Sequence, residues 1–268
     1  MSDGIKASLS GKYRCKFAFC FQNLRKEVVN RKSLFMMEEI MNKPIFAPSL
    51  MCMDITNTRN EMDVMNETCN MFHVDIMDGH FVKNITLSAD FIKAIRSLAQ
   101  LPIEAHLMVE NPNDFIADMA AAGADYITVH AETIQENAFR TLQKIKDLSC
   151  KRGVCLCPAT PLSSIEAYLD EVELVTVMTV DPGYAGSKFI PQMIDKVARL
   201  EQMRNERDLD FIIQCDGAIG AKTYASLYNA GARAFVLGSS GLFFKDGSLK
   251  DNSKRMKAEF EEATGIKV

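Results

Sequence analysis

The residues best suited to chemistry lie in one short stretch, which begins at His73 and runs through Asp75 to Gly79. Apolar residues alternate there with a histidine and an aspartate, a pattern typical of a β-strand. Successive side chains of a strand point to opposite faces, so the His73 imidazole and the Asp75 carboxylate share one face. An imidazole and a carboxylate in that arrangement can both reach a single metal ion. The stretch therefore predicts half of a metal site near the end of a strand.

The elements that would position such a site recur from Pro44 onward. Short apolar segments typical of buried strands alternate with segments of helical spacing. The expected strands are residues 45–50, 71–77, 103–109, 126–129, 153–157, 174–180, 211–215 and 234–237. The expected helices are residues 57–69, 88–98, 112–122, 134–148, 162–169, 190–206, 220–229 and 249–263. Eight such units predict an α/β fold, a (β/α)8 TIM barrel in a single domain spanning residues 43–268.

The alternative fold is a doubly wound open sheet, but Gly-x-Gly-x-x-Gly does not follow the first expected strand. A barrel carries its active site at the C-terminal ends of its strands. His106 ends the third strand and Asp216 ends the seventh, so both join His73 and Asp75. Two histidines and two carboxylates predict one divalent ion per subunit, zinc first, with manganese, iron or cobalt as alternatives. A purely structural role for these side chains is the competing interpretation.

Two glycine-rich turns follow late strands, one at Gly183 to Gly186 and one at Gly238-Ser239-Ser240. Glycine lets backbone N–H groups approach an oxyanion closely, and the N-terminus of a helix attracts phosphate. Because each turn is expected to lead into a helix, the pair predicts a phosphate site. The substrate would then be a small phosphorylated molecule with the metal at its other end.

Asp75 and Asp216 belong to strands on opposite sides of the expected barrel mouth. A divalent ion on a carbonyl oxygen acidifies the neighbouring carbon, and a carboxylate can remove its proton to give an enediolate. A second carboxylate that returns a proton to the opposite face would invert that carbon. This reaction is an epimerisation and needs no nucleotide or organic cofactor. An apolar wall would come from methionines, for which core packing is an equal alternative: Met77, Met108 and Met178.

The composition excludes several classes of protein. The chain has 268 residues, a net charge of −4 and 47% hydrophobic residues, so we expect a soluble protein that binds neither nucleic acid nor membrane. Most of its eight cysteines lie in apolar segments, which indicates free thiols and a cytoplasmic location.

Residues 1–42 differ in composition, with eight basic and two acidic residues up to Leu34. We expect a poorly ordered, non-catalytic N-terminal extension. A transit peptide is one alternative. Upstream sequence read in frame is another, since Met36, Met37 and Met41 precede the first strand.

Seven motifs together give the chain a specific resemblance. They are Ala-Pro-Ser-Leu (47–50), His-Val-Asp-Ile-Met-Asp-Gly-His-Phe-Val-x-Asn-Ile-Thr (73–86), His-Leu-Met (106–108), Ala-Gly-Ala-Asp-Tyr-Ile-Thr-Val-His (122–130), Pro-Ala-Thr-Pro (158–161), Met-Thr-Val-x-Pro-Gly-Tyr-x-Gly (178–186) and Cys-Asp-Gly (215–217). From about Ile45 to Phe244 the chain resembles the ribulose-phosphate 3-epimerase family.

The resemblance implies that His73, Asp75, His106 and Asp216 bind the metal, and that the two aspartates are the acid–base pair. It implies a substrate contact from Ser49, and we expect further substrate contacts from Met77, His106, Met108 and Met178. It implies phosphate contacts from nine: Gly183, Tyr184, Ala185, Gly186, Gly217, Ala218, Gly238, Ser239 and Ser240. It also implies a homo-oligomer, either a dimer or a hexamer.

Departures from the family pattern favour its D-allulose-6-phosphate 3-epimerase branch. Ser-Leu-Met-Cys-Met-Asp (49–54) stands where Ser-Ile-Leu-Ser-Ala-Asp is usual, and Ala185 replaces a glycine. Cys52 and Met53 would alter the pocket near its mouth. The first expectation is therefore interconversion of D-allulose 6-phosphate and D-fructose 6-phosphate, and the alternative is D-ribulose 5-phosphate and D-xylulose 5-phosphate. A barrel that binds a sugar phosphate without turnover is a third reading. A related decarboxylase would need a lysine near the second-strand carboxylates.

Overall fold

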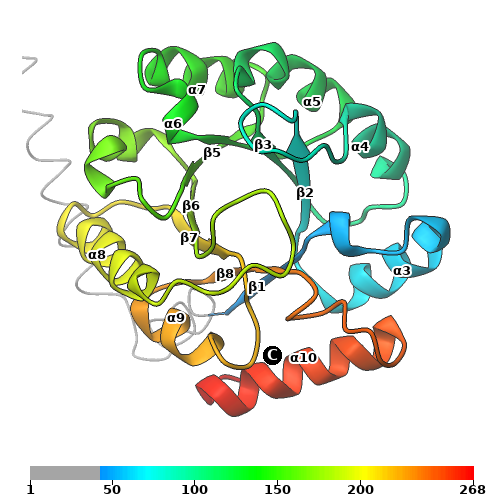
Figure 1. Cartoon of the computed structure of the whole chain (residues 1–268). Helices are drawn as coiled ribbons and strands as arrows, with labels where there is room; N and C mark the ends of the chain where they lie inside the picture. The colour runs from blue at the N-terminus through cyan, green and yellow to red at the C-terminus, as the bar shows by residue number, and fades with distance from the viewer. Residues whose placement is uncertain (1–42) are drawn as a thin grey trace, which may run out of the picture. The chain divides into compact units, whose positions relative to one another are not determined.

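The computed structural model describes residues 43–268, so the predictions for residues 1–42 lie outside it. Eight parallel strands form one sheet in the order β1-β8-β7-β6-β5-β4-β3-β2 (Figure 1). They are β1 Ile45–Pro48, β2 Phe72–Met77, β3 Ile103–Met108, β4 Tyr126–His130, β5 Lys151–Leu156, β6 Leu174–Met178, β7 Ile212–Asp216 and β8 Ala234–Leu237. A parallel bridge between Ser49 and His73 links β1 to β2. The sheet thus nearly closes on itself, which confirms the predicted barrel.

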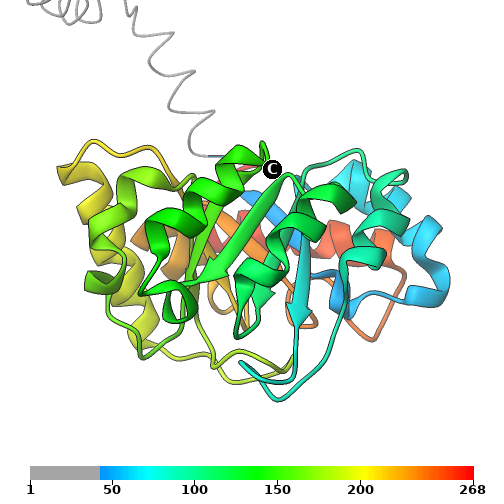
Figure 2. The ribbon, with the colours of Figure 1, turned by 90° about the horizontal axis from the view of Figure 1, so that it is seen from above.

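Helices follow the strands and surround the sheet (Figures 1 and 2). The α-helices are α3 Thr58–Thr68, α4 Ala89–Arg96, α5 Ile116–Ala122, α6 Ala131–Ile134, α7 Ala138–Asp147, α8 Gln192–Glu206, α9 Tyr224–Ala230 and α10 Leu249–Thr264. Short 3-10 helices complete the ring: η1 Leu50–Cys52, η2 Ile55–Asn57, η3 Pro112–Asp114, η4 Leu162–Ser164 and η5 Glu166–Glu171. Within residues 43–268, these helices are all too short or too polar to cross a bilayer.

Four helix predictions need correction. The helix expected over residues 134–148 is only Ala138–Asp147, preceded by the separate short helix α6, and the one expected from residue 220 begins at Tyr224. The α-helix expected over residues 162–169 is instead the pair η4 and η5, and Tyr168 interrupts η5 with φ −132° and ψ 20°. The helix expected from residue 112 starts as the 3-10 turn η3, and α5 begins only at Ile116. Isolated helices this short are marginal in water, so packing on the barrel decides their form.

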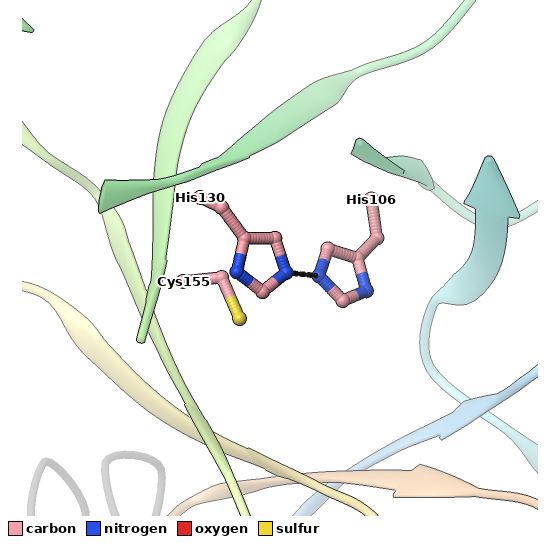
Figure 3. Close-up of side chains that lie close together, drawn as sticks. All are labelled: His106, His130 and Cys155. Carbon is pink, nitrogen blue, oxygen red and sulfur yellow. Dashed lines mark hydrogen bonds between the residues drawn. The ribbon is translucent and has the colours of Figure 1, made fainter. Parts of the chain in front are cut away.

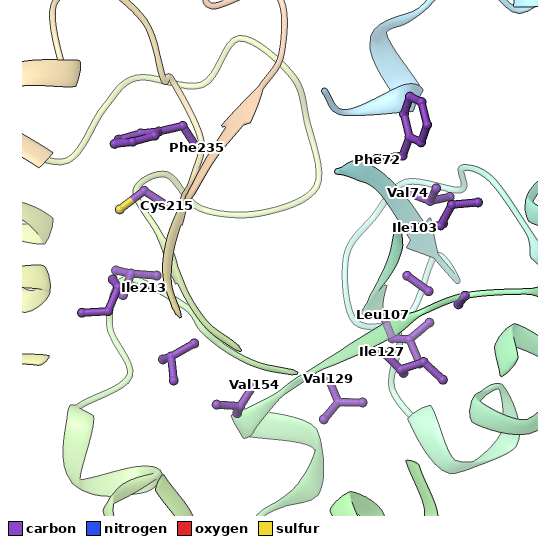
Figure 4. Packing of buried hydrophobic residues seen from close by; sticks show 14 of the residues in the cluster. Phe72, Val74, Ile103, Leu107, Ile127, Val129, Val154, Ile213, Cys215 and Phe235 are labelled. Atoms are coloured by element: carbon purple, nitrogen blue, oxygen red, sulfur yellow. The ribbon is translucent and has the colours of Figure 1, made fainter. Parts of the chain in front are cut away.

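The strands bury side chains on both of their faces. Those that point outward fill the space between the sheet and the helices, as Val74, Leu107, Val154 and Ile213 do in Figure 4. These four side chains have no solvent exposure. Because both faces are covered, the strands read as nearly continuous apolar runs in the sequence.

Side chains that point inward differ in kind along the barrel axis. One cluster is apolar and comprises Ala47, Met71, Tyr126 and Leu174. The next residues along the strands are polar and fully buried: His73, Glu104, Thr128, Thr176 and Gln214. Gly153 leaves room for this polar layer, since a Cβ atom there would lie 2.2 Å from the Thr128 hydroxyl oxygen.

Helix α10 packs against the junction of β1 and β8 through one aromatic side chain, Phe260. Its ring lies edge-on to Phe46 and Tyr224, each with centroids 5.2 Å apart, and to Phe235 at 5.5 Å. The side chain has no solvent exposure. The ring therefore fixes the last helix across the region where the barrel closes.

The Phe260→Ala variant should lower the free energy of unfolding by about 3–5 kcal/mol, because it removes a buried ring and leaves a cavity. Urea unfolding followed by circular dichroism measures this change. Phe139→Ala is the matched control, since that ring is 59% exposed and its loss should cost far less. Equal losses in the two variants would show that α10 does not secure the barrel.

Candidate active site

Four side chains from three strands converge at the C-terminal end of the barrel. The atoms that meet are His73 Nε2, Asp75 Oδ1, His106 Nδ1 and Asp216 Oδ2, all within 4.8 Å of one another. His73 Nε2 lies 3.2 Å from both Asp75 Oδ1 and His106 Nδ1. Asp216 Oδ2 lies 3.8 Å from His73 Nε2 and 3.7 Å from His106 Nδ1. The structure thus brings together the four residues expected to bind a metal.

The spacing of these atoms fits a tetrahedral metal site. Bonds of ~2.0–2.1 Å to nitrogen and oxygen ligands place the ligand atoms of a tetrahedron about 3.3 Å apart. His106 Nδ1 lies 3.4 Å from Asp75 Oδ1, and the other measured separations run from 3.2 to 3.8 Å. The cluster could therefore hold a divalent ion with little rearrangement.

The electrostatics of the cluster favour a positive charge at its centre. Burial acts to lower the pKa of His73, but the carboxylates of Glu104 and Asp75 outweigh it and hold that pKa well above its usual value. Burial acts to raise the pKa of Asp75, yet the two histidines hold it well below its usual range. The carboxylates of Asp75 and Asp216 thus meet at a centre whose negative charge a divalent cation would offset.

The two aspartates of the cluster have different proton affinities. Burial raises the pKa of Asp216 to about 6, and the negative charge of Asp75 adds to this while His73 opposes it. Asp75 also accepts a 2.5 Å hydrogen bond from the Ser49 hydroxyl, which donates to Oδ2. Two carboxylates whose environments separate their pKa values are suited to acid and base roles.

Glu104 supports the cluster from below. Its Oε2 accepts hydrogen bonds from His73 Nδ1 at 2.8 Å and from the Gln214 amide at 2.9 Å. Its Oε1 accepts from the Thr128 hydroxyl at 2.6 Å, and the Thr176 hydroxyl in turn donates to Gln214. A carboxylate on the far nitrogen of a histidine fixes the ring orientation that leaves Nε2 free to bind a metal.

His106 has a longer chain of partners on its far side. Its Nε2 lies 3.0 Å from His130 Nε2 (Figure 3). On the other side of that ring, His130 Nδ1 lies 3.2 Å from Glu132 Oε2. Burial lowers the pKa of His130 to about 4, so that ring is neutral at pH 7. Two further clusters share His130, one with His106 and Cys155 and one with Glu132 and Cys157.

A cavity of about 180 Å³ opens above the cluster. It is lined by Asp75 and Asp216 and by the predicted substrate and phosphate residues other than His106, which does not line it. These lining residues are Ser49, Met77, Met108, Met178, Gly183, Tyr184, Ala185, Gly186, Gly217, Ala218, Gly238, Ser239 and Ser240. Cys52 also lines the cavity, whereas Met53 packs in the core and not at the mouth as expected.

The segments that follow β2 and β6 meet at this end of the barrel (Figure 2). The Asn84 amide donates to the carbonyl of Gly183 at 2.8 Å, and the Tyr184 hydroxyl donates to the carbonyl of Lys83 at 2.5 Å. The helix expected over residues 190–206 is α8, which begins at Gln192, so the turn at Gly183 to Gly186 does not lead directly into it. The turn at Gly238 closes one helical turn, with the N–H of Leu242 donating to the Gly238 carbonyl.

A comparison with known protein families shows to which family the chain belongs. The description of the matching family is "Ribulose-phosphate 3 epimerase family", and the match spans residues 45–243. The chain belongs to this family. Membership makes it an isomerase, and the site described above is the part of the fold that carries the predicted motifs.

Curated relatives in the family are similar over most of their length. The ribulose-phosphate 3-epimerase of Bacillus subtilis (strain 168) is 40% identical over 196 residues, which cover 72% of this chain and 90% of that protein. The Methanocaldococcus jannaschii protein of the same name is 41% identical over 199 residues, covering 74% and 83%. The Escherichia coli (strain K12) protein is 35% identical over 202 residues, covering 75% and 89%.

Solved structures of low sequence identity share the fold of this family member. KGPDC from Streptococcus mutans aligns with a TM-score of 0.61 at 14% identity, covering 82% of this chain and 99% of that one. A chain of the tryptophan synthase complex from Pyrococcus furiosus aligns with a TM-score of 0.56 at 17% identity, covering 83% and 98%. At such identities the likeness concerns the barrel alone.

Sequence reasoning missed the supporting glutamates, Glu104 and Glu132. Glu104 is a charged residue inside the apolar segment 103–109, two positions before His106 and on the same strand face. That placement was a usable signal, because a charge in a buried strand needs a partner. Glu132 lies two residues after His130, and the sequence alone does not show that its carboxylate contacts that ring or that the ring contacts His106.

The Glu104→Leu variant should lower the free energy of unfolding by about 3–5 kcal/mol, because it leaves His73 without its buried ionic partner. Denaturant unfolding measures the change. Thr128→Val is the control: it removes one hydrogen bond to the same carboxylate but leaves the bonds to His73 and Gln214, and it should cost less, about 1–3 kcal/mol. Similar losses in both variants would mean that Glu104 does not organise the polar layer.

Proposed function

We propose that the chain is a metal-dependent 3-epimerase that interconverts D-ribulose 5-phosphate and D-xylulose 5-phosphate. One observation supports this most strongly: two aspartates with different proton affinities, Asp75 buried and Asp216 half-buried, belong to one cation-binding cluster beneath a small cavity. The pentose phosphate substrates are supported by the names of the curated relatives. A cytoplasmic homo-oligomer, a dimer or a hexamer, is part of the same proposal.

The metal in this proposal is held by His73, Asp75, His106 and Asp216, with zinc as the first candidate and manganese, iron or cobalt as alternatives. When bound, a divalent ion would stabilise negative charge on the substrate's carbonyl oxygen and so acidify the adjacent C3. Glu104 keeps His73 in the orientation that such binding requires.

Asp75 and Asp216 carry the proton transfers. One carboxylate removes the C3 proton from one face of the substrate, and the other delivers a proton to the opposite face, which inverts the carbon. The raised pKa of Asp216, about 6, suits a carboxyl group that holds a proton at the start of one direction of the reaction. Asp75, whose pKa is held low, suits the group that accepts a proton in that direction.

The remaining lining residues bind and orient the substrate. Met77 and Met108 pack together in one apolar cluster and Met178 lies in another, so methionines bound the cavity beside the two aspartates. These side chains exclude water from the reacting carbon. The turns at residues 183–186, 217–218 and 238–240 offer backbone N–H groups to the phosphate.

The Asp216→Asn variant should reduce kcat by at least about 100-fold, because an amide can neither donate nor accept the proton. The measurement is epimerisation monitored with zinc content and circular dichroism determined on the same sample. Asp210→Asn, at an exposed position, is the matched control and should retain activity. Undiminished turnover in Asp216→Asn would remove this residue from the acid–base pair.

The ketohexose reaction is a second candidate, favoured by the turn after β1. Cys52 and Met51 line the cavity, and Cys52 Sγ lies 3.6 Å from where a Cβ on Gly238 would be. The turn therefore contacts the expected phosphate turn, and its side chains affect the space between that turn and the metal cluster. A substrate one carbon longer, D-allulose 6-phosphate, would use that space.

The ratio of kcat/KM for the two substrates distinguishes these candidates. Enzyme stripped of metal and reconstituted with one ion should turn over D-ribulose 5-phosphate with the higher kcat/KM, and it should lose activity when the ion is removed. A clear preference for D-allulose 6-phosphate would replace the pentose assignment with the hexose one while leaving the chemistry unchanged.

A further inference from the structure

The proposed metal ligand His106 lies at one end of a series of hydrogen bonds that runs through His130 to Glu132. Figure 3 shows the first of these bonds, between His106 and His130. Its Nδ1 faces the metal cluster and its Nε2 faces His130 Nε2 at 3.0 Å. Two ring nitrogens at this distance share one proton, so one must donate and the other accept. The direction of that bond decides which nitrogen of His106 carries the proton.

Glu132 sets the direction from the far end of the series. Its Oε2 lies 3.2 Å from His130 Nδ1, and a carboxylate only accepts hydrogen bonds. His130 therefore carries its proton on Nδ1, which leaves its Nε2 as an acceptor. His106 must then donate from Nε2, and its Nδ1 is left with a free lone pair directed at the cluster.

Glu132 is itself held in place by two donors. Its Oε1 accepts the backbone N–H of Cys157 at 2.9 Å and the hydroxyl of Thr160. The backbone N–H of Cys157 can only donate a hydrogen bond, because an amide nitrogen does not accept one. One oxygen of the carboxylate thus accepts hydrogen bonds from the loop after β5, and the other accepts from His130.

We propose that His130 and Glu132 are positioning residues, which fix His106 in the tautomer that can bind the metal through Nδ1. This inference rests on the metal site of the proposed function and adds two residues to it. Each histidine ligand is then oriented by a buried or half-buried glutamate, His73 directly by Glu104 and His106 through His130.

The same chain of bonds bears on a neighbouring cluster. His130, Glu132 and Cys157 lie close enough to hold a metal of their own. A metal on His130 Nδ1 would move the ring proton to Nε2, where it would face the Nε2 proton of His106. Occupancy of that cluster is therefore incompatible with metal binding through His106 Nδ1.

The substitution Glu132→Gln should reverse the direction of these hydrogen bonds while keeping the shape of the side chain. The amide oxygen must face the Cys157 N–H, so the amide NH2 group faces His130 Nδ1. His130 would then accept at Nδ1 and donate from Nε2, and His106 would carry its proton on Nδ1, against the metal. We expect zinc affinity to fall by about 10–100-fold.

Glu104→Gln is the matched comparison, because the same change from carboxylate to amide should leave the tautomer of its histidine partner, His73, unchanged. The oxygen of Glu104 that faces His73 already accepts two donors, so the amide oxygen stays on that side. The NH2 group then faces the Thr128 hydroxyl, which can act as an acceptor. His73 should therefore keep its proton on Nδ1.

Two measurements on the zinc-loaded protein test the inference. The first is ¹⁵N NMR of the histidine rings, with His130→Gln used to identify the His130 signals among the four histidines. The wild type should show His130 protonated on Nδ1, and Glu104→Gln should leave the His73 tautomer unchanged. A wild-type His130 protonated on Nε2 would overturn the inference.

The second measurement is the zinc dissociation constant from competition with a chelator. Thr160→Val is the control for this measurement, because it removes a hydrogen bond to Glu132 without reversing the direction of the bonds that lead to His106. Its affinity for zinc should change by no more than a few-fold. His130→Gln retains an acceptor for His106 and should bind zinc more tightly than His130→Leu.

Unchanged affinity in Glu132→Gln, or two zinc ions per chain, would also overturn the inference. Failure of the wild type to bind zinc would overturn the proposed metal site itself, and the inference with it.

Discussion

The carboxylate of Glu104 lies inside the barrel with no access to solvent, so the protein must supply all of its hydrogen bonds. Three strands meet that requirement through His73, Thr128 and Gln214. The same bonds orient the His73 ring toward the two aspartates. The polar layer therefore serves stability and the site at once, and neither could change without the other.

The two aspartates of the cluster show how one barrel produces two kinds of carboxyl group. Both lie beside the same histidines, but the Asp75 carboxylate accepts a hydrogen bond from the Ser49 hydroxyl while Asp216 faces the charge of Asp75. Like charges close together cannot both ionise easily, so one carboxyl group retains its proton to higher pH. This inequality arises from position alone, since both side chains are aspartate.

Much of this could be predicted from the sequence, and the limits have physical causes. The eight strands and the four cluster residues could be predicted because histidine and aspartate stand out at the ends of apolar segments. Glu104 was not assigned, because its role depends on the register that places it opposite His73 on the neighbouring strand. The α-helix expected over residues 162–169 failed because so short a segment takes its form from tertiary packing. The link from His106 to Glu132 needed atomic positions in β3, β4 and α6 and in the loop after β5.

The hydrogen bonds that join Asn84 to Gly183 and Tyr184 to Lys83 have a consequence for ligand binding. A ligand that orders two independent loops loses the conformational entropy of both. Here the loops after β2 and β6 are already fastened to each other, so they lose that freedom during folding and not at the moment of binding. Part of the affinity for substrate is thus built in before the substrate arrives.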